Sequence, residues 1–384
     1  MSDALHKVLG DISVASGLPN AHYVDPATYE TERERIFFKG WAAIGFEADA
    51  RAPADVYPVD FMGVPLIIVR GKDKAVRVFQ NTCRHRGMIL VDKPGTLKGP
   101  IRCPYHSWCY DLKGALVRTP YVGGVDVDTH DDVDPSTLGL FEVRSHIWHG
   151  CVFVNISGDA PDFETANADL LSRWAEFDKP FYVPSRSSIF SMTVKTNWKL
   201  AIENFCESYH LPWVHPELNE ISNINDHYNI DEHENYAGQG SKIYRQLKDE
   251  TGRVFPDFDG VGARWDTASE YASWFPNVLM GVHRDYAYAV ILMPEGPGQT
   301  TERVGMFYAR DLDESFEPML AENARIWRDV FSEDVGVIEG MQKGRHGPLF
   351  DGGKFSPVMD GPTHTFHKWV ARKMLEDAAQ AVSQ

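Results

Sequence analysis

The sequence predicts an α+β fold in which a small antiparallel β module precedes a larger domain of helices and an antiparallel sheet. Two patterns in the sequence lead to this prediction. Residues 41–156 contain short runs rich in Val and Ile, such as VPLIIVR, which Gly, Pro and Asp separate. After a segment at 157–163 in which Gly, Asp and Pro are crowded, helical and strand patterns are mixed. A chain of 384 residues is long enough for both domains.

The individual elements are predicted from helix starts and β-rich runs. Asp25 and Pro26 are typical of a helix start and indicate an opening helix over 25–39. The larger domain is predicted to contain helices at 169–177, 203–209 and 319–343 and strands at 287–293 and 304–308. We therefore expect three parts: a helical N-terminal segment that packs on the larger domain (1–40), the β module (41–157) and the larger domain (158–384).

Charge and composition exclude several classes of protein. A formal net charge of −17 argues against nucleic acid or an anionic membrane as the main partner. No run approaches the roughly 18 apolar residues of a membrane-spanning helix, and the first residues do not resemble a secretory signal. Neither a G-x-G-x-x-G nor a G-x-x-x-x-G-K-[ST] motif is found. We expect a cytoplasmic protein without a nucleotide site of its own.

The first candidate metal site combines two cysteines with two histidines. Cys83 and His85 form a C-x-H step, Cys103 and His106 form a C-x2-H step, and seventeen residues lie between His85 and Cys103. Two thiolates suit one iron of a [2Fe–2S] cluster, and two neutral imidazoles suit the other. Zinc is the alternative, but zinc fingers pair like residues, as C-x2-4-C and H-x3-5-H. Because the number of cysteines is odd, five, a disulfide framework is not predicted, and Cys151 and Cys206 read as buried thiols.

The second candidate metal site contains His210 and His215. Five residues span about 140° around a regular helix, so an unbroken helix would not aim both rings at one ion. Pro212 between them is predicted to break the helix and let His215 turn back. Two histidines and one carboxylate would suit a non-haem Fe(II) with open positions for O2. Taken alone, the pair is weak evidence and is more typical of structural histidines.

Together these motifs resemble those of the Rieske non-haem iron oxygenases, in their large (α) subunits. The resemblance rests on CRHRG, CPYHSWCYDLKGAL and the pattern N-x2-E-x-Y-H-x4-H that ends at His215. Respiratory-chain Rieske proteins carry an extra cysteine in each box, where this chain has Met88 and Tyr105. The resemblance implies a Rieske [2Fe–2S] domain at 41–157 and a helix-grip-like catalytic domain with a mononuclear iron at 158–384. Within this family, the sequence most resembles the glycine betaine, carnitine and choline monooxygenases.

The resemblance also implies roles for single residues. Asp334 is implied as the third iron ligand, with Glu333 and Glu339 as alternatives. Glu207 is implied to link His210 with His106 of a neighbouring subunit and so to couple the two metal sites, and Asn204 is also assigned to the catalytic site. Phe205, Leu211 and Trp213 resemble pocket positions. A further set of aromatic residues is predicted either to form walls of the substrate pocket or to belong to the core: Trp213, Tyr228, Tyr236, Trp265, Trp274, Phe275 and Tyr286.

The implied reaction uses O2 and electrons that pass one at a time through the cluster to Fe(II). Because the chain has no nucleotide motif, NAD(P)H would be oxidised by a separate ferredoxin or flavin reductase. This reductase is expected to dock on the basic residues Arg84, Arg86, Lys93, Lys98 and Arg102. The expected assembly is a homotrimer. The expected reaction is hydroxylation or oxidative N-demethylation of a small methylammonium compound; the alternatives are an aromatic-ring hydroxylating dioxygenase and a pure electron-transfer protein.

Overall fold

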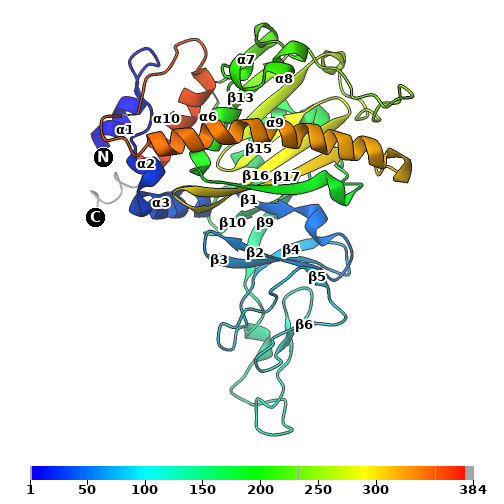
Figure 1. Ribbon diagram of the computed structural model, residues 1–384. Helices are drawn as coiled ribbons and strands as arrows, with labels where there is room; N and C mark the ends of the chain where they lie inside the picture. Colours follow the sequence, from blue (N-terminus) through cyan, green and yellow to red (C-terminus); the bar gives the residue numbers. More distant parts are fainter. Residues whose placement is uncertain (1, 232, 351, 377–384) are drawn as a thin grey trace. The chain divides into compact units, whose positions relative to one another are not determined.

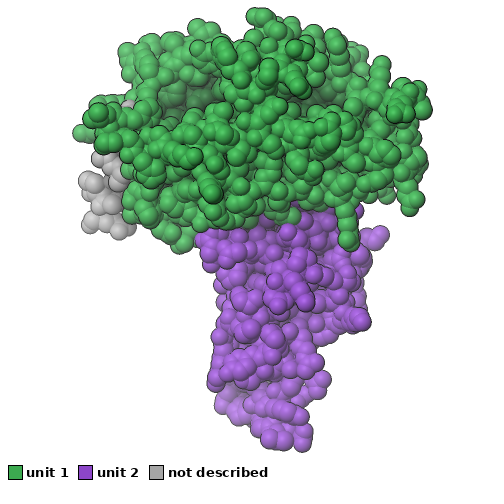
Figure 2. Space-filling view, viewed as in Figure 1, with its two compact units in different colours: residues 1–42, 160–384 green, residues 43–159 purple. Residues whose placement is uncertain are grey.

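The computed structural model describes residues 2–231, 233–350 and 352–376 (Figure 1). Contacts divide the chain into two compact units, one formed by residues 43–159 and the other by residues 1–42 and 160–384 (Figure 2). The limits predicted for the β module lie two residues from these divisions. Residues 377–384 of the predicted larger domain lie outside the described residues.

The unit of residues 43–159 is built from two antiparallel sheets. The larger has the strand order β1 (Ala42–Phe46), β10 (Cys151–Asn155), β9 (Glu142–Trp148), β4 (Val76–Gln80), β3 (Val64–Arg70), β2 (Asp55–Phe61), β5 (Gly95–Thr96). The smaller consists of β6 (Ile101–Arg102), β7 (Cys109–Tyr110) and β8 (Leu116–Arg118). One apolar cluster, which includes Ile67, Phe79 and Trp108, also holds Cys83 and Cys103. The two cysteines are therefore anchored in the core of this unit.

The other unit contains a second antiparallel sheet and most of the helices. Its strand order is β11 (Ile189–Val194), β17 (Gln299–Tyr308), β16 (Tyr286–Gly296), β15 (Val278–Val282), β14 (Ser269–Trp274), β13 (Tyr236–Ser241), β12 (His227–Ile230). The long helix α9 (Glu317–Gly344) runs across this sheet (Figure 1). Its buried side chains recur every three or four residues, and Trp327 Nε1 donates a hydrogen bond to Tyr286 Oη at 2.9 Å. The predicted α+β class is thereby confirmed.

The remaining helices differ in part from the predicted ones. The predicted opening helix is divided into α3 (Pro26–Glu32) and a π-helical turn at 33–38, and Asp25 caps it by accepting from the Thr28 N–H. The helix predicted at 169–177 ends at Arg173, and a 3-10 turn follows it. The other helices are α1 (Ser2–Val8), α2 (Ala21–Val24), α4 (Phe163–Ala166), α5 (Ala168–Arg173), α6 (Trp198–Phe205), α7 (Leu211–Val214), α8 (Pro216–Ile221), α10 (Gly361–Leu375). Within the described ranges, none of the helices combines the length and the apolar content that a membrane crossing requires.

A buried ion pair connects α6 with the N-terminal segment. Lys199 Nζ lies 2.5 Å from Glu32 Oε2, and neither side chain is exposed. His22 Nδ1 lies 2.9 Å from the other carboxylate oxygen of Glu32. Burial by itself raises the pKa of Glu32, but the charge of Lys199 and the contacts with His22 outweigh it, so the pKa is lowered. The carboxylate therefore stays ionised in the interior and holds α3 against α6.

Lys199→Met should destabilise the fold by about 3–5 kcal/mol, because it leaves the Glu32 carboxylate buried without a charge partner. Urea unfolding of the holoprotein measures this change. The double variant Glu32→Gln/Lys199→Met, in which neither charge remains, should lose less stability than the single one. An unfolding midpoint of Lys199→Met equal to that of the wild type would contradict a stabilising role of the pair.

Candidate metal centres

The loops that carry Cys83 and Cys103 share one backbone conformation. The N–H of Gly87 donates to the carbonyl of Cys83 at 2.9 Å, and the N–H of Ser107 donates to that of Cys103 at 3.1 Å. Both donors lie four residues after the cysteine and have positive φ angles, 74° at Gly87 and 60° at Ser107. Glycine adopts this conformation without strain, whereas it is uncommon for serine. The two loops therefore turn back in the same way and present their cysteines to a common interior point.

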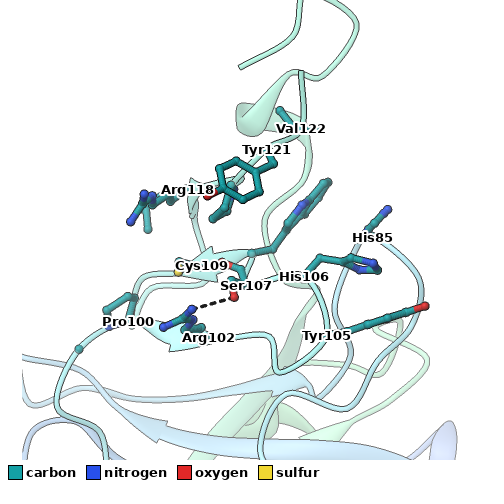
Figure 3. A pocket seen from close by; sticks show the side chains of 14 residues that line it. His85, Pro100, Arg102, Tyr105, His106, Ser107, Cys109, Arg118, Tyr121 and Val122 are labelled. Atoms are coloured by element: carbon teal, nitrogen blue, oxygen red, sulfur yellow. Dashed lines mark hydrogen bonds between the residues drawn. The ribbon is translucent and has the colours of Figure 1, made fainter. Parts of the chain in front are cut away.

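The thiols of this site are buried and the imidazoles lie at the surface. Cys83 and Cys103 are each 2% exposed, whereas His85 is exposed and His106 half-buried. The two rings lie close together, with centroids 4.7 Å apart (Figure 3). Burial raises the pKa of the Cys83 thiol, although Tyr110 Oη, 3.3 Å from the sulfur, opposes this. A buried thiol pair beside two outward imidazoles fits a [2Fe–2S] cluster whose positive irons would hold the sulfurs as thiolates.

Aromatic rings hold the two imidazoles in place. Trp108 stacks on His85 with ring planes 9° apart, and the Tyr105 ring lies 3.7 Å from that of His106. These side chains line an open surface hollow, at whose edge Arg102 donates to Ser107 Oγ at 2.8 Å (Figure 3). The imidazole side of this site is therefore accessible to a partner molecule.

The second candidate site brings His210, His215 and Asp334 together. One potential ligand atom from each lies within 4.8 Å of the others. Asp334 Oδ1 is 3.0 Å from His215 Nε2 and 3.7 Å from His210 Nε2. The histidines flank α7, and the aspartate projects from α9. Two imidazoles and one carboxylate around a common point are the donor set of a mononuclear non-haem iron with open positions.

The helix break that separates the two histidines from α6 lies before His210, and the predicted role of Pro212 is wrong. Helix α6 begins at its cap Asn197 and ends at Phe205, so the predicted helix at 203–209 is only partly formed. Pro212 occupies the first turn of α7, where no backbone N–H is required for a helical hydrogen bond. The break is instead stabilised by Glu207, whose carboxylate accepts from the backbone N–H groups of Tyr209 and His210.

Three polar side chains orient the three clustered residues. Glu207 Oε1 lies 2.6 Å from His210 Nδ1, and Glu333 Oε2 lies 2.6 Å from His215 Nδ1. A carboxylate at Nδ1 requires the proton there and leaves Nε2 free for a metal. Burial lowers the pKa of His215, but Asp334 and Glu333 outweigh it and the pKa is raised. Asn204 Nδ2 donates to Asp334 Oδ1 at 3.1 Å, so the predicted Asn204 also belongs to this constellation.

The alternative acids on α9 occupy other positions. Glu333 lies at the Nδ1 side of His215, away from the common point. Glu339 accepts a hydrogen bond from the backbone N–H of Lys195 at 3.0 Å. Of the three acids considered from the sequence, only Asp334 faces both Nε2 atoms.

A cavity adjoins the three clustered residues and is walled mainly by aromatic rings. Phe205 and Leu211 line it as predicted, whereas Trp213 is 72% exposed and is not part of its wall, which corrects the prediction. The other aromatic residues proposed from the sequence do not line it either; they are Tyr228, Tyr236, Trp265, Trp274, Phe275 and Tyr286. The rings that sequence reasoning missed are Tyr271, Tyr288, Trp327 and Phe331.

Part of this wall could have been found in the sequence. Trp327, Phe331 and Asp334 are separated by four and three residues, so they share one face of α9. The strand residues Tyr271 and Tyr288 carry no comparable local signal. In the structure Tyr288 packs 4.2 Å from Trp327 and 5.5 Å from Phe331, measured between ring centroids.

Comparison with known proteins gives consistent matches along the chain. Residues 172–376 match the ring hydroxylating alpha subunit (catalytic domain) family, and residues 40–131 match the Rieske [2Fe–2S] domain. Choline monooxygenase from Spinacia oleracea is 26% identical over 93% of this chain and 78% of its own length. The carnitine monooxygenase oxygenase subunit of Escherichia coli (strain K12) is 26% identical over 85% of this chain and 83% of its own.

Solved structures have the same fold. A quaternary ammonium Rieske monooxygenase aligns with a TM-score of 0.78 at 21% identity, over 97% of this chain and 98% of that chain. Naphthalene 1,2-dioxygenase from Rhodococcus sp. aligns with a TM-score of 0.72 at 18% identity, over 98% of this chain and 97% of its own. The catalytic-domain match alone covers more than half of the chain. The chain therefore belongs to the ring-hydroxylating alpha subunits and is the terminal oxygenase of a Rieske system, with a [2Fe–2S] cluster and a mononuclear iron.

Proposed function

We propose that this oxygenase hydroxylates or oxidatively N-demethylates a small methylammonium compound at an iron held by His210, His215 and Asp334. The observation that carries this proposal is the aromatic wall next to these three residues. Aromatic faces attract an ammonium group most strongly where water is excluded, and Tyr288 is fully buried. An N-methyl group held by these rings would lie close to the iron.

The names of the relatives favour the same substrate class. The similar choline and carnitine monooxygenases act, by their names, on quaternary ammonium compounds. Arene hydroxylation is the second candidate, because aromatic walls also stack on arenes and naphthalene 1,2-dioxygenase has the same fold.

The protein side chains contribute orientation and proton positions to this reaction. When bound, the mononuclear iron would supply the activation of O2, and the cluster at Cys83, His85, Cys103 and His106 would supply electrons. Glu207 and Glu333 would keep the proton of each histidine on Nδ1. Asn204 would hold Asp334 in the orientation that faces both Nε2 atoms.

We extend the proposal to a homotrimer in which Glu207 links His210 to His106 of a neighbouring subunit. Glu207 is only 12% exposed, and its carboxylate already contacts His210 Nδ1 and two backbone N–H groups. A link to a second histidine would therefore use an oxygen that now accepts from the backbone. Inter-subunit electron transfer is described for the similar quaternary ammonium Rieske monooxygenase.

The electron donor is proposed to be a separate NAD(P)H-dependent ferredoxin or flavin reductase that docks near the cluster loops. Arg86, Lys93, Lys98 and Arg102 are exposed there. Arg84 is less suited to docking, because its guanidinium donates to the carbonyl of Gly139 at 2.6 Å and lies over the ring of Phe141. The cytoplasmic location stays a prediction.

The substrate class is tested with the reconstituted enzyme and a reductase system. Choline and tetramethylammonium should support O2 uptake coupled to product, whereas naphthalene and benzoate should not. Trp327→Leu should lower kcat/KM roughly tenfold, since a desolvated cation–π contact contributes ~1–2 kcal/mol. Trp213→Leu, which changes an exposed tryptophan outside the cavity, is the matched control.

His210→Ala separates the two metal centres in the same assay. It should keep the visible absorption of the cluster and form no product, because His210 belongs to the mononuclear site alone. Product formation by this variant would contradict the proposed iron site. Turnover of the arenes without turnover of the ammonium compounds would instead favour the second candidate function.

Glu333→Gln should weaken the binding of the mononuclear iron roughly 10–100-fold, because His215 loses the carboxylate that fixes its ring. Iron content after dialysis against a graded chelator measures this effect, with cluster absorbance as the internal reference. Glu339→Gln, on the same helix but bonded to Lys195, should keep the wild-type iron content. Equal iron loss in both variants would exclude a specific role for Glu333.

Reversal of two exposed charges, Arg86→Glu and Lys93→Glu together, should slow reduction of the cluster by the reductase. Stopped-flow bleaching of the cluster measures the rate, and the difference from wild type should shrink as salt screens the charges. Lys242→Glu/Arg245→Glu, which changes exposed cations in the other unit, is the control. Unchanged kinetics at low salt would rule out the proposed docking surface.

A further inference from the structure

We infer that the part of the substrate beyond its methylammonium group carries an uncharged oxygen and no carboxylate, and that Tyr288 is the hydrogen-bond partner of that oxygen. This inference rests on the proposed function and narrows its substrate class. It separates choline-like substrates, which end in a hydroxyl group, from betaine-like substrates, which end in a carboxylate.

The first argument is the charge of the cavity wall. Among the described residues that line the cavity there is no lysine or arginine, and Asp334 is an acid. Glu207 and Glu333 add two carboxylates behind the two histidines, so that together with Asp334 the carboxylate charge exceeds the two positive charges of a bound Fe(II). A carboxylate that enters such a site loses its hydration and meets no lysine or arginine, which is unfavourable.

The buried cations Lys199 and Arg345 and the partly buried Arg173 of the same unit are already paired elsewhere. Lys199 is held by Glu32 at 2.5 Å, Arg345 contacts Glu203 at 3.5 Å, and Arg173 bonds Glu270 at 2.9 Å. None of these three cations lines the cavity. If one of them turned toward a substrate carboxylate, its glutamate partner would remain buried without a charge partner. The unfavourable free energy of that change makes these cations unsuitable as counter-ions for the substrate.

The second argument is the Tyr288 hydroxyl. The side chain is fully buried and lines the cavity, and its oxygen has no hydrogen-bond partner among the described residues. The ring lies directly over Gly281, where an added Cβ would come within 2.5 Å of it, and Trp327 covers it at 4.2 Å between centroids. A buried hydroxyl held in this way and left without a partner is costly, and a substrate oxygen would supply the missing bond.

The neighbouring Tyr271 hydroxyl is already bonded within the protein. Its oxygen accepts from Ser269 Oγ at 3.0 Å and lies 3.1 Å from His283 Nε2. Among the described tyrosines that line the cavity, Tyr288 is therefore the one whose hydroxyl lacks a partner.

Both hydroxyls belong to one row across the sheet. Tyr271 pairs with Gly281 on β15, and Gly281 pairs with Tyr288 on β16. Because the glycine between them has no side chain, the two phenols flank one position on the cavity wall. The neutral Tyr288 hydroxyl at this place suits an alcohol, ether or carbonyl oxygen, which needs a hydrogen bond but no counter-ion.

The test compares three ligands by isothermal titration calorimetry with the anaerobic holoenzyme. Choline should bind at least tenfold more tightly than glycine betaine, which carries a carboxylate at the corresponding end. Tyr288→Phe should weaken choline binding roughly fivefold to tenfold and leave tetramethylammonium, which has no oxygen, unchanged. Since the deleted hydroxyl has no partner in the protein, this variant should fold as the wild type does.

Tyr308→Phe is the matched control, because the Tyr308 hydroxyl lies on the same sheet but accepts from Asn323 and is outside the cavity wall. It should leave the ratio of choline to tetramethylammonium affinity unchanged. Glycine betaine binding as tightly as choline would overturn the inference while the proposed function stands. An equal effect of Tyr288→Phe on choline and tetramethylammonium would also overturn it. If no ammonium compound binds and an arene does, the proposed function itself fails.

Discussion

The catalytic unit depends on one constraint, the fixed position of α6, because this helix carries Asn204 and leads into the segment with His210 and His215. Charged side chains buried in the interior hold α6 in place. Lys199 on α6 is paired with Glu32, and one turn later Glu203 accepts from Tyr23 and contacts Arg345. Ion pairs of this kind tolerate only one geometry, because displacement of either partner leaves a bare charge in an apolar medium. The end of α6 is thereby held at a defined distance from α9.

The residues that lie together at the two candidate metal centres could be predicted from the sequence because most of them are local. Cys83 and His85 lie on one loop, Cys103 and His106 on another, and His210 and His215 flank a single helical turn. Short spacings of rare residue types are informative even when the fold is not known. The α+β class could likewise be predicted, since periodicity and turn residues are properties of short segments.

The cavity wall could not be predicted in the same way. Phe205 comes from α6, Tyr271 and Tyr288 from different strands, and Trp327 from α9. Only the sheet register and the packing of α9 bring these rings together. Many other aromatic residues of the chain belong to the core, and the sequence does not distinguish them from the residues of the cavity wall. The break before His210 escaped prediction for a related reason. It depends on the Glu207 carboxylate bonding to the backbone, whereas Pro212 offered a more familiar but incorrect explanation.

The bare α-carbon of Gly281 has a consequence for the cavity wall. The Tyr288 ring occupies the space that a Cβ at position 281 would need. The position of this part of the cavity wall therefore depends on the absence of a side chain at Gly281. A change from glycine to alanine on β15 would shift this part of the wall without altering any iron ligand. In this chain the position of the cavity wall and the proposed iron ligands therefore depend on different residues, so a change at Gly281 alters the first and leaves the second as it is.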